Sequence, residues 1–374
     1  MAMGNVPLII QRYVFRELFV TSAAVTVVLF LIFLSSWFAR LLGQVTSGGL
    51  RPELLFWLLS LKSVDAMVIL LPLAFYLAGL LTLGRLYKDS EMTAMLACGV
   101  SPLKVFSVVL WTGTGFALVV AAIALYFAPA AQGQRFQVQA ELEADVGLEA
   151  VTAGQFRALA EGQVVFYAER LSDDGRTMEN VFIQGRRDGV LNLVSAAEAF
   201  RMDDEESGAQ YLVLKDGYRY EGEPGTASFQ VTRFAEHGVR IERDETVLEV
   251  DARAARSSWL LWHSPSLKDQ AELQWRVSMP LTTVLLGALA VFLSRTNPRQ
   301  GRYAKFFVGI LAYVVYSNLL SVARAWLEKG AVPVYVGMWW LHAALAVLVL
   351  ALVLRQLAGA RAARRIVMDA RETA

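Results

Sequence analysis

The residue types that most often carry chemistry are scarce in this sequence and widely separated. The chain has 374 residues but only one cysteine, Cys98, and three histidines, His237, His263 and His342. One cysteine cannot form an internal disulfide, and the histidines lack the spacing of metal ligands. We therefore predict no metal site, with Cys98 serving as a small packing residue rather than a reactive thiolate.

Motifs for nucleotide binding and hydrolysis are also absent from the sequence. It contains no G-x-x-x-x-G-K-[ST] phosphate loop, no H-E-x-x-H helix and no G-x-S-x-G turn. The apolar segments hold no cluster of carboxylates of the kind that proton-coupled carriers use. We therefore expect a chain that is not an enzyme and binds no cofactor.

Composition indicates the environment in which this chain folds. Hydrophobic residues make up 56% of the sequence, charged residues 18%, and the mean hydropathy is +0.44. These values are too apolar for a soluble enzyme of this length. The net charge of +1 gives no broad field that would attract nucleic acid. We conclude that most of the chain lies in a membrane.

Six charge-poor stretches are each close to the roughly 20 residues that cross the hydrocarbon core of a bilayer. They are residues 18–39, 54–84, 105–128, 277–294, 304–323 and 335–354. The sequence predicts an α-helical membrane protein with six transmembrane helices in a 3+3 arrangement around an insertion. Lys62 and Asp65 lie one helical turn apart early in the second span, where we expect them to form a pair.

The distribution of Lys and Arg near the ends of the spans predicts the orientation. The segments expected inside hold Arg12, Arg16, Arg85, Lys88, Lys104, Arg295, Arg299, Arg302, Lys305, Arg355, Arg361, Arg364, Arg365 and Arg371. The short segments expected outside hold only Arg40, Arg51, Arg324 and Lys329. Both termini are therefore predicted to be cytoplasmic, and Trp339 and Trp340 to anchor the outer interface.

The insertion, residues 135–270, has the pattern of an all-β domain. Short runs rich in Val, Phe and Tyr alternate with Asp-Gly and Glu-Pro-Gly turn signals. We expect a jelly roll, sandwich or open barrel on the outer side of the membrane, flanked by membrane domains at 1–134 and 271–374. Candidate residues for its inner face are Val165, Phe182, Leu193, Leu212 and Phe229, although the alternation does not tell the two faces apart.

The segment LYKDSEMTAMLACGVSP, residues 86–102, predicts a short capped helix between the second and third spans, at about 90–98. Asp89 or Ser90 could cap its N-terminus, where Glu91 complements the helix dipole. Gly99 suits a left-handed C-terminal residue, and Pro102 suits the first turn of the next helix.

One side of this short helix is apolar, because Met92, Met95 and Leu96 follow helical spacing. Two interpretations are open on the pattern alone. The apolar face could dock into a cytoplasmic groove of a partner, or the helix could be an interfacial turn in which Glu91 only complements the dipole.

Four motifs of the chain resemble a known family. They are RYVFRE at 12–17, LGRLYKDSEMTAMLACGVSP at 83–102, ELQWRVSMPL at 272–281 and NPRQGR at 297–302. In this order around a β domain, they resemble the lipopolysaccharide-export permeases of the LptF/LptG (YjgP/YjgQ) family, and above all the F-type subunit.

This resemblance implies a multi-pass subunit of the bacterial inner membrane that pairs with a G-type permease subunit. Twelve helices would then surround a cavity that takes lipopolysaccharide from the membrane. ATP and Mg would belong to a separate cytoplasmic ATPase dimer. The β domain would be a jelly roll that passes the lipid to periplasmic β-jelly-roll bridge proteins on the way to the outer membrane.

The resemblance also assigns residues. Glu91, with Ser90, Met92 and Met95 around it, matches the coupling helix that meets the ATPase. Arg40, at the outer end of the first span, matches a basic position that faces the lipid phosphates; interfacial snorkelling is the alternative. Trp37 stands one turn earlier, where some relatives carry a second basic residue.

The NPRQGR motif, with Asn297, Pro298, Arg299 and Arg302, would either shape the surface that faces the ATPase or anchor the helices from the inside. Two other functions stay open at this point. The chain could transmit ATPase motion to periplasmic partners as a scaffold without passing a substrate, or it could be an autonomous ion-coupled carrier, which the lack of intramembrane carboxylates disfavours.

Overall fold

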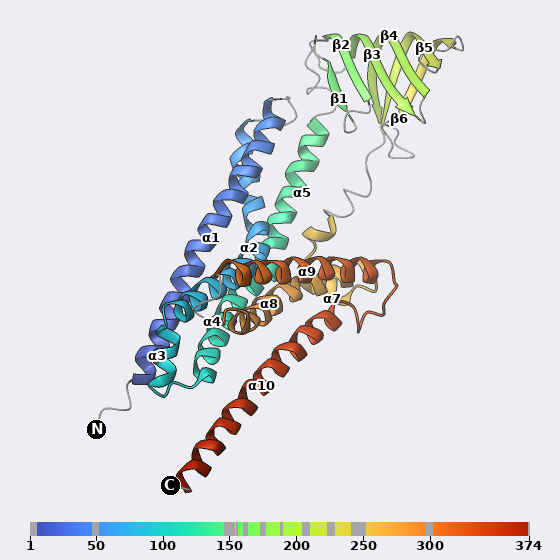
Figure 1. Ribbon diagram of the computed structural model, residues 1–374. Coiled ribbons are helices and arrows are strands. Elements are labelled where there is room, and N and C mark those ends of the chain that lie inside the picture. The colour runs from blue at the N-terminus through green and yellow to red at the C-terminus, as the bar shows by residue number, and fades with distance from the viewer. Residues whose placement is uncertain are drawn as a thin grey trace. The chain divides into compact units, whose positions relative to one another are not determined.

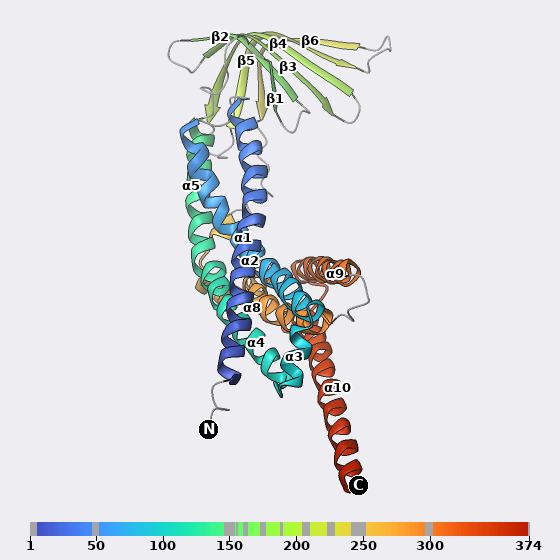
Figure 2. The same ribbon diagram turned by 60° about the vertical axis from the view of Figure 1, so that its left-hand side comes forward.

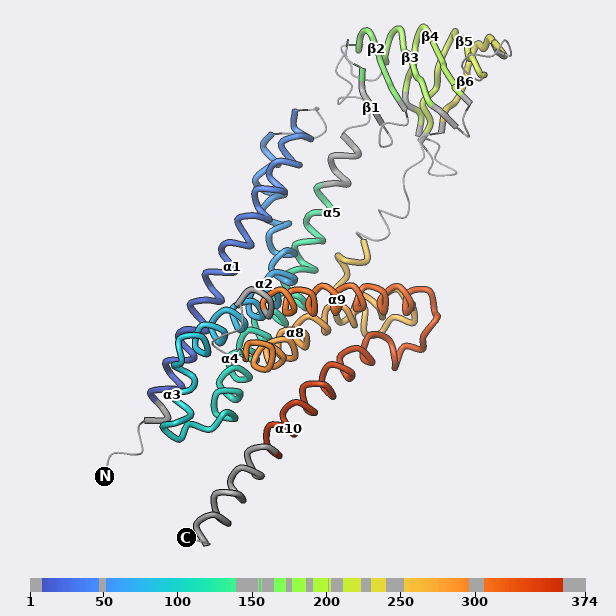
Figure 3. Tube along the Cα trace, viewed as in Figure 1, coloured from blue at the N-terminus to red at the C-terminus, as the bar shows by residue number. Residues whose placement is uncertain are grey.

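The structure is a computed structural model of the whole chain, and the residues that it places uncertainly are drawn in grey in Figure 3. The described residues are 6–46, 52–145, 154, 156–159, 164–172, 177–187, 190–203, 210–222, 229–240, 252–295 and 302–372. The chain divides into two compact units. One comprises Met1–Arg40, Phe56–Arg135 and Asp251–Ala374, and the other Leu41–Leu55 and Phe136–Val250.

Six helices of the described chain are long and apolar enough to cross a membrane, which confirms the predicted number of spans. The long helices in Figure 1 are α1 (Val6–Thr46), α2 (Leu55–Lys88), α4 (Pro102–Ala122), α8 (Leu267–Leu293), α9 (Arg302–Glu328) and α10 (Trp339–Glu372). One π-helical turn, η2 (Ile123–Phe127), joins α4 to α5 (Ala128–Asp145) in a single span. Three shorter helices are η1 (Pro52–Leu54), α3 (Glu91–Ala97) and α7 (Ser258–His263).

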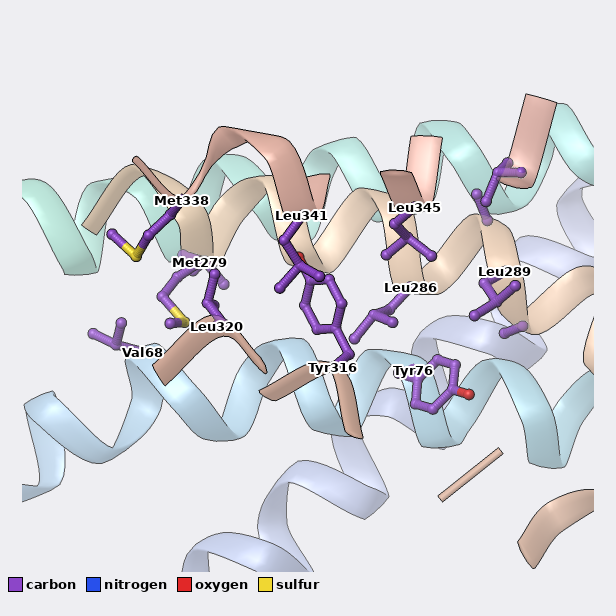
Figure 4. Packing of buried hydrophobic residues seen from close by; sticks show 14 of the residues in the cluster. Val68, Tyr76, Met279, Leu286, Leu289, Tyr316, Leu320, Met338, Leu341 and Leu345 are labelled. Atoms are coloured by element: carbon purple, nitrogen blue, oxygen red, sulfur yellow. The ribbon is translucent and has the colours of Figure 1, made fainter. Parts of the chain in front are cut away.

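Helix α8 is the centre of the helical unit. Small residues allow close packing on it: an added Cβ at Gly287 would overlap the ring of Phe75 from α2. The largest core cluster joins α8 to α2, α4, α9 and α10. Figure 4 shows Tyr316, Leu341 and Leu286 of this cluster pointing toward one another. Because α8 is the shared neighbour, it sets the positions of the other helices.

A second core cluster packs the N-terminal end of α1 and the C-terminal end of α2 against α3 and α4. Its members include Val14 and Leu18 of α1, Leu83 and Leu86 of α2, and Met92 of α3. Their burial fixes the short helix α3 on the helices beside it.

The β unit contains one antiparallel sheet of six described strands, which lie side by side in chain order (Figure 1), and Figure 2 shows the same sheet turned by 60°. They are β1 (Arg157–Leu159), β2 (Val164–Leu171), β3 (Thr177–Arg187), β4 (Val190–Asp203), β5 (Gln210–Gly222) and β6 (Phe229–Arg240). The predicted combination of membrane helices with an inserted β domain is therefore confirmed. Compared with the predicted limits of 135–270, the described strands span 157–240, and residues 252–270 belong to the helical unit.

A crease crosses this sheet. Regular pairing is interrupted at Asn180 of β3 and Asp216 of β5, which have left-handed φ angles of 49° and 47°. On β3, Met178 and Val181 are both buried although they are three positions apart. A two-residue repeat cannot place both on one face, so the crease shifts the alternation. One apolar face thereby stays buried on both sides of the crease.

The buried face is not the one that the sequence suggested. The buried cluster contains Phe166, Val181 and Val194, which are the neighbours in sequence of Val165, Phe182 and Leu193. Those three predicted inner residues lie on the opposite face, because successive residues of a strand point to opposite sides. Leu212 does pack against the buried cluster. The side chain of Phe229 lies outside the described residues.

Candidate functional site: the coupling helix and the outer end of the first span

The short helix predicted at about 90–98 exists as α3, with a different start from the one expected. Ser90 has a left-handed φ of 59° and its side chain caps nothing, because residues 89 and 90 form the tight turn that leaves α2. The Asp89 backbone N–H still donates to the Arg85 carbonyl at 2.9 Å. The end of α3 is as predicted: Gly99 has a φ of +84°, and Ser101 caps α4 with Pro102 in the first turn.

The apolar side of α3 faces the protein's own core, so the predicted docking role of Met92 is wrong. Met92 is 3% exposed and packs in the second core cluster, against which Met95 also packs. The sequence pattern gave an apolar face correctly but could not say what covers it. The side of α3 open to a partner carries Thr93, Ala94 and Leu96. Cys98, predicted to pack, is exposed at the end of α3.

Glu91 belongs to a chain of polar contacts that joins three helices. The Tyr13 hydroxyl donates to Glu91 Oε2 at 2.8 Å, and Arg85 Nη2 donates to the Tyr13 hydroxyl at 3.2 Å. The same Arg85 nitrogen lies 3.0 Å from Glu17 Oε2. Glu91 is therefore more than a dipole-complementing charge. Tyr13, Glu17 and Arg85 were not predicted as site residues, although all three lie in the motifs RYVFRE and LGRLYKDSEMT.

The C-terminal end of α1, predicted to lie outside, brings two cations to one aromatic ring. The Arg40 guanidinium carbon lies 5.3 Å from the ring centroid of Trp37, and Lys62 Nζ of α2 lies 4.9 Å from the same centroid. Arg40 is exposed, as a residue that grips a ligand must be. The predicted pair of Lys62 with Asp65 is confirmed at 3.7 Å. Trp37 thus does not leave this end of the span with a single positive charge, because α2 supplies the second.

The start of α8 is an ionic centre built on the ELQWR sequence. Glu272 accepts from Arg276 at 3.0 Å and from Arg324 of α9 at 2.8 Å. Arg276, whose side chain is 4% exposed, also donates to the carbonyls of Ala254 and Arg256. Buried charges of this kind are tolerated only when they are paired and hydrogen-bonded. This centre fixes the chain that returns from the β unit onto α8 and α9.

Gln274, in the same motif, holds the loop between α9 and α10. Its Nε2 donates to the Val334 carbonyl at 2.7 Å, and its Oε1 accepts from the Met338 backbone at 2.9 Å. The motif is therefore largely structural. Among the described residues, no group of three or more His, Cys, Asp or Glu side chains could hold a metal ion.

Comparison with known proteins assigns this combination of helices, β unit and motifs to a family. The family model described as lipopolysaccharide export system permease LptF/LptG matches residues 12–355. The chain belongs to this family. It is 30% identical over 349 residues to the lipopolysaccharide export system permease protein LptF of Escherichia coli K12, covering 93% of this chain and 94% of that protein. The LptF protein of Shigella flexneri matches to the same extent.

These similarities confirm the resemblance seen in the sequence and support the F-type assignment. A permease is a transporter subunit and not a catalyst, which agrees with a chain whose motifs hold no nucleotide loop. The predicted roles of the NPRQGR motif cannot be compared with the structure. Asn297, Pro298 and Arg299 lie outside the described residues, as does the side chain of Arg302.

His342 is buried in the helical unit of this LptF/LptG permease at 5% exposure, although it follows the two tryptophans that were predicted to anchor the outer interface. Its Nε2 lies 2.8 Å from Ser278 Oγ of α8, and its Nδ1 lies 2.6 Å from the Tyr316 hydroxyl of α9. Both ring nitrogens are thus engaged, and His342 ties α10 to α8 and α9. The sequence suggested the interface because Trp339 and Trp340 precede it; burial was decided by the packing of α10.

Proposed function

We propose that this chain is the F-type half of an ATP-driven permease that takes lipopolysaccharide out of the bacterial inner membrane. Its match to the LptF/LptG family over residues 12–355 is the observation that carries the proposal. The chain works as a heterodimer with a G-type subunit. A separate cytoplasmic ATPase dimer supplies ATP and Mg, since this sequence has no phosphate loop of its own.

The ATPase acts on the permease by contacting α3. The exposed side of this helix, with Thr93, Ala94 and Leu96, fits a groove on the ATPase, and Glu91 at its start offers a carboxylate to a cation there. Met92 and Met95 contribute by fixing α3 to α2 and α4. A rigid-body movement of the ATPase therefore reaches the membrane helices through a firmly packed element.

Lipid phosphates bind at the outer end of α1. Arg40 grips a phosphate with paired hydrogen bonds, because a guanidinium matches the geometry of phosphate oxygens. Lys62 adds a second cation across the Trp37 ring, whose face attracts both. The two positive groups thus come from two different helices of the same unit.

The β unit receives the acyl chains, and its buried cluster, which contains Phe166, Val181 and Val194, holds the sheet in shape. Its edge strands, β1 and β6, are the two described strands with one neighbour each. Unpaired backbone groups on such edges allow β-strand addition. The bridge proteins toward the outer membrane pair with one of these edges.

Six spans place the two termini on the same side of the membrane, and the basic residues near the span ends favour the cytoplasmic side. The β unit between α5 and α8 then lies in the periplasm.

The decisive experiment uses Glu91→Lys in the complex with the G-type subunit and the ATPase. The charge reversal should abolish ATP-driven release of lipopolysaccharide from proteoliposomes while membrane insertion is unchanged, because a cation of the ATPase then meets a like charge. Asp89→Lys is the matched control, since Asp89 is exposed two residues away and makes the same charge change. Normal release by the Glu91→Lys complex would contradict the assignment. Photocrosslinking of lipopolysaccharide at position 40 separates an exporter from a scaffold that never contacts the lipid.

A further inference from the structure

Helix α1 connects the two ends of the proposed transport cycle. Its cytoplasmic end holds Tyr13 and Glu17, which contact Glu91 and Arg85, and its outer end holds Arg40. The helix is continuous from Val6 to Thr46. At 1.5 Å of rise per residue, Tyr13 and Arg40 lie about 40 Å apart along it.

The anchoring of α1 is concentrated at its cytoplasmic end. Val14 is 1% exposed and Leu18 is 0% exposed, both in the cluster that also holds Met92. Farther along, Val27 is 56% exposed and Ile32 is 60% exposed. In the most apolar 18-residue stretch of each helix, only 11% of the residues of α1 are buried within the chain, compared with 61% of those of α2. A displacement of α1 within this chain is therefore controlled mainly where α3 touches it.

The polar contacts at that point are suited to transmission. Glu91 accepts from Tyr13 with Oε2, and an ionised carboxylate has acceptor sites on its other oxygen as well. Glu91 can hold Tyr13 and a cation of the ATPase at the same time. Arg85, paired with Glu17 and donating to Tyr13, ties the same point to α2.

We propose that Tyr13 and Arg85 are positioning residues that orient Glu91 and convert a movement of α3 into a movement of α1, and thus of Arg40. This inference rests on the proposed function, since it assumes that the ATPase acts on α3. Tyr13 is the essential link because its hydroxyl contacts both Glu91 and Arg85. The buried neighbours Val14 and Leu18 pack in the same cluster as Met92 of α3, so that α1 and α3 move together.

The test is Tyr13→Phe in the full complex, with ATP hydrolysis and lipopolysaccharide release measured on the same proteoliposomes. The ring keeps its packing against the second core cluster, and only the hydroxyl is lost. The complex should still assemble and hydrolyse ATP, but lipid released per ATP should fall about tenfold or more, as expected for the loss of a hydrogen bond to a charged group. Tyr126→Phe is the matched control, because Tyr126 is 73% exposed.

A structural readout accompanies the activity. Spin labels at Ser36 of α1 and Ser60 of α2, both exposed, report the outer end of α1 after Cys98 is replaced by serine. ATP should change the distance between the labels in the otherwise unaltered complex, and Tyr13→Phe should remove that change.

Three results are distinguishable. Unchanged release per ATP in Tyr13→Phe overturns the inference, and so does an equal loss of assembly and hydrolysis, which would make Tyr13 a residue of the fold or of docking. If the unaltered complex itself releases no lipopolysaccharide with ATP, the proposed function fails.

Discussion

Replacing Glu272 by glutamine should destabilise the helical unit more than any exposed charge substitution. Glu272 is 12% exposed and lies between Arg276, at 4%, and Arg324, at 25%. The amide removes the counter-charge of two guanidinium groups, one of them almost fully buried. Removing one partner of a buried ion pair costs about 3–5 kcal/mol, because the remaining charge stays out of water without compensation.

We expect a value at the lower end, about 3 kcal/mol, because the glutamine oxygen still accepts one N–H. Arg276 also keeps its bonds to the carbonyls of Ala254 and Arg256. The free energy of unfolding is measured by titrating the detergent-solubilised protein with sodium dodecyl sulfate. Glu236→Gln is the control: Glu236 is 60% exposed, 3.7 Å from Lys215, and should cost less than about 1 kcal/mol.

A double-mutant cycle assigns the cost to the pair. Arg324→Gln alone should cost about 1–2 kcal/mol, because Glu272 keeps Arg276 and the Arg324 side chain is partly exposed. The double variant should be less destabilised than the sum of the two single variants by about 1 kcal/mol, since the two side chains are in direct contact. A Glu272→Gln cost equal to that of the Glu236→Gln control, or strict additivity, would refute the reasoning.

Two further predictions concern the outer end of α1 and the orientation of the chain. Arg40→Gln should lower photocrosslinking of lipopolysaccharide to a probe at the exposed position 36, and adding Lys62→Gln should lower it further. The control Lys104→Gln should leave crosslinking unchanged. Equal crosslinking in all variants would show that lipid does not bind at this end of α1. Cys98, the single cysteine, is exposed, and it should react with a charged thiol reagent only after the inner membrane is permeabilised. Lys215→Cys in a Cys98→Ser background should react without permeabilisation of the inner membrane. The reverse pattern would overturn the predicted orientation.

Local pattern was enough to predict the general architecture. Long charge-poor stretches identified six spans because a bilayer demands a fixed length of apolar helix. Turn signals identified the β insertion, and Gly99 with Pro102 located the end of α3 and the start of α4. These features depend on residues close together in the chain, so the sequence carries them directly.

The short helix also shows where local pattern stops. Periodicity identified the apolar face of α3 but not its neighbour, and burial of Met92 at 3% turned a supposed docking face into core. The same holds for β2 and β3, where both faces carry apolar residues. A choice between Val165 and Phe166 as the inner residue therefore required the crease and the sheet register.

The sequence by itself determined the class of this protein: six membrane spans with an inserted β unit, a short helix between the second and third spans, and the motifs of the permease family. Only the tertiary structure placed Lys62 beside Trp37 and Tyr13 beside Glu91, a contact between residues 78 positions apart. The physical reason is that a side chain's partner is set by how helices pack, and packing joins residues that no periodicity along the chain relates.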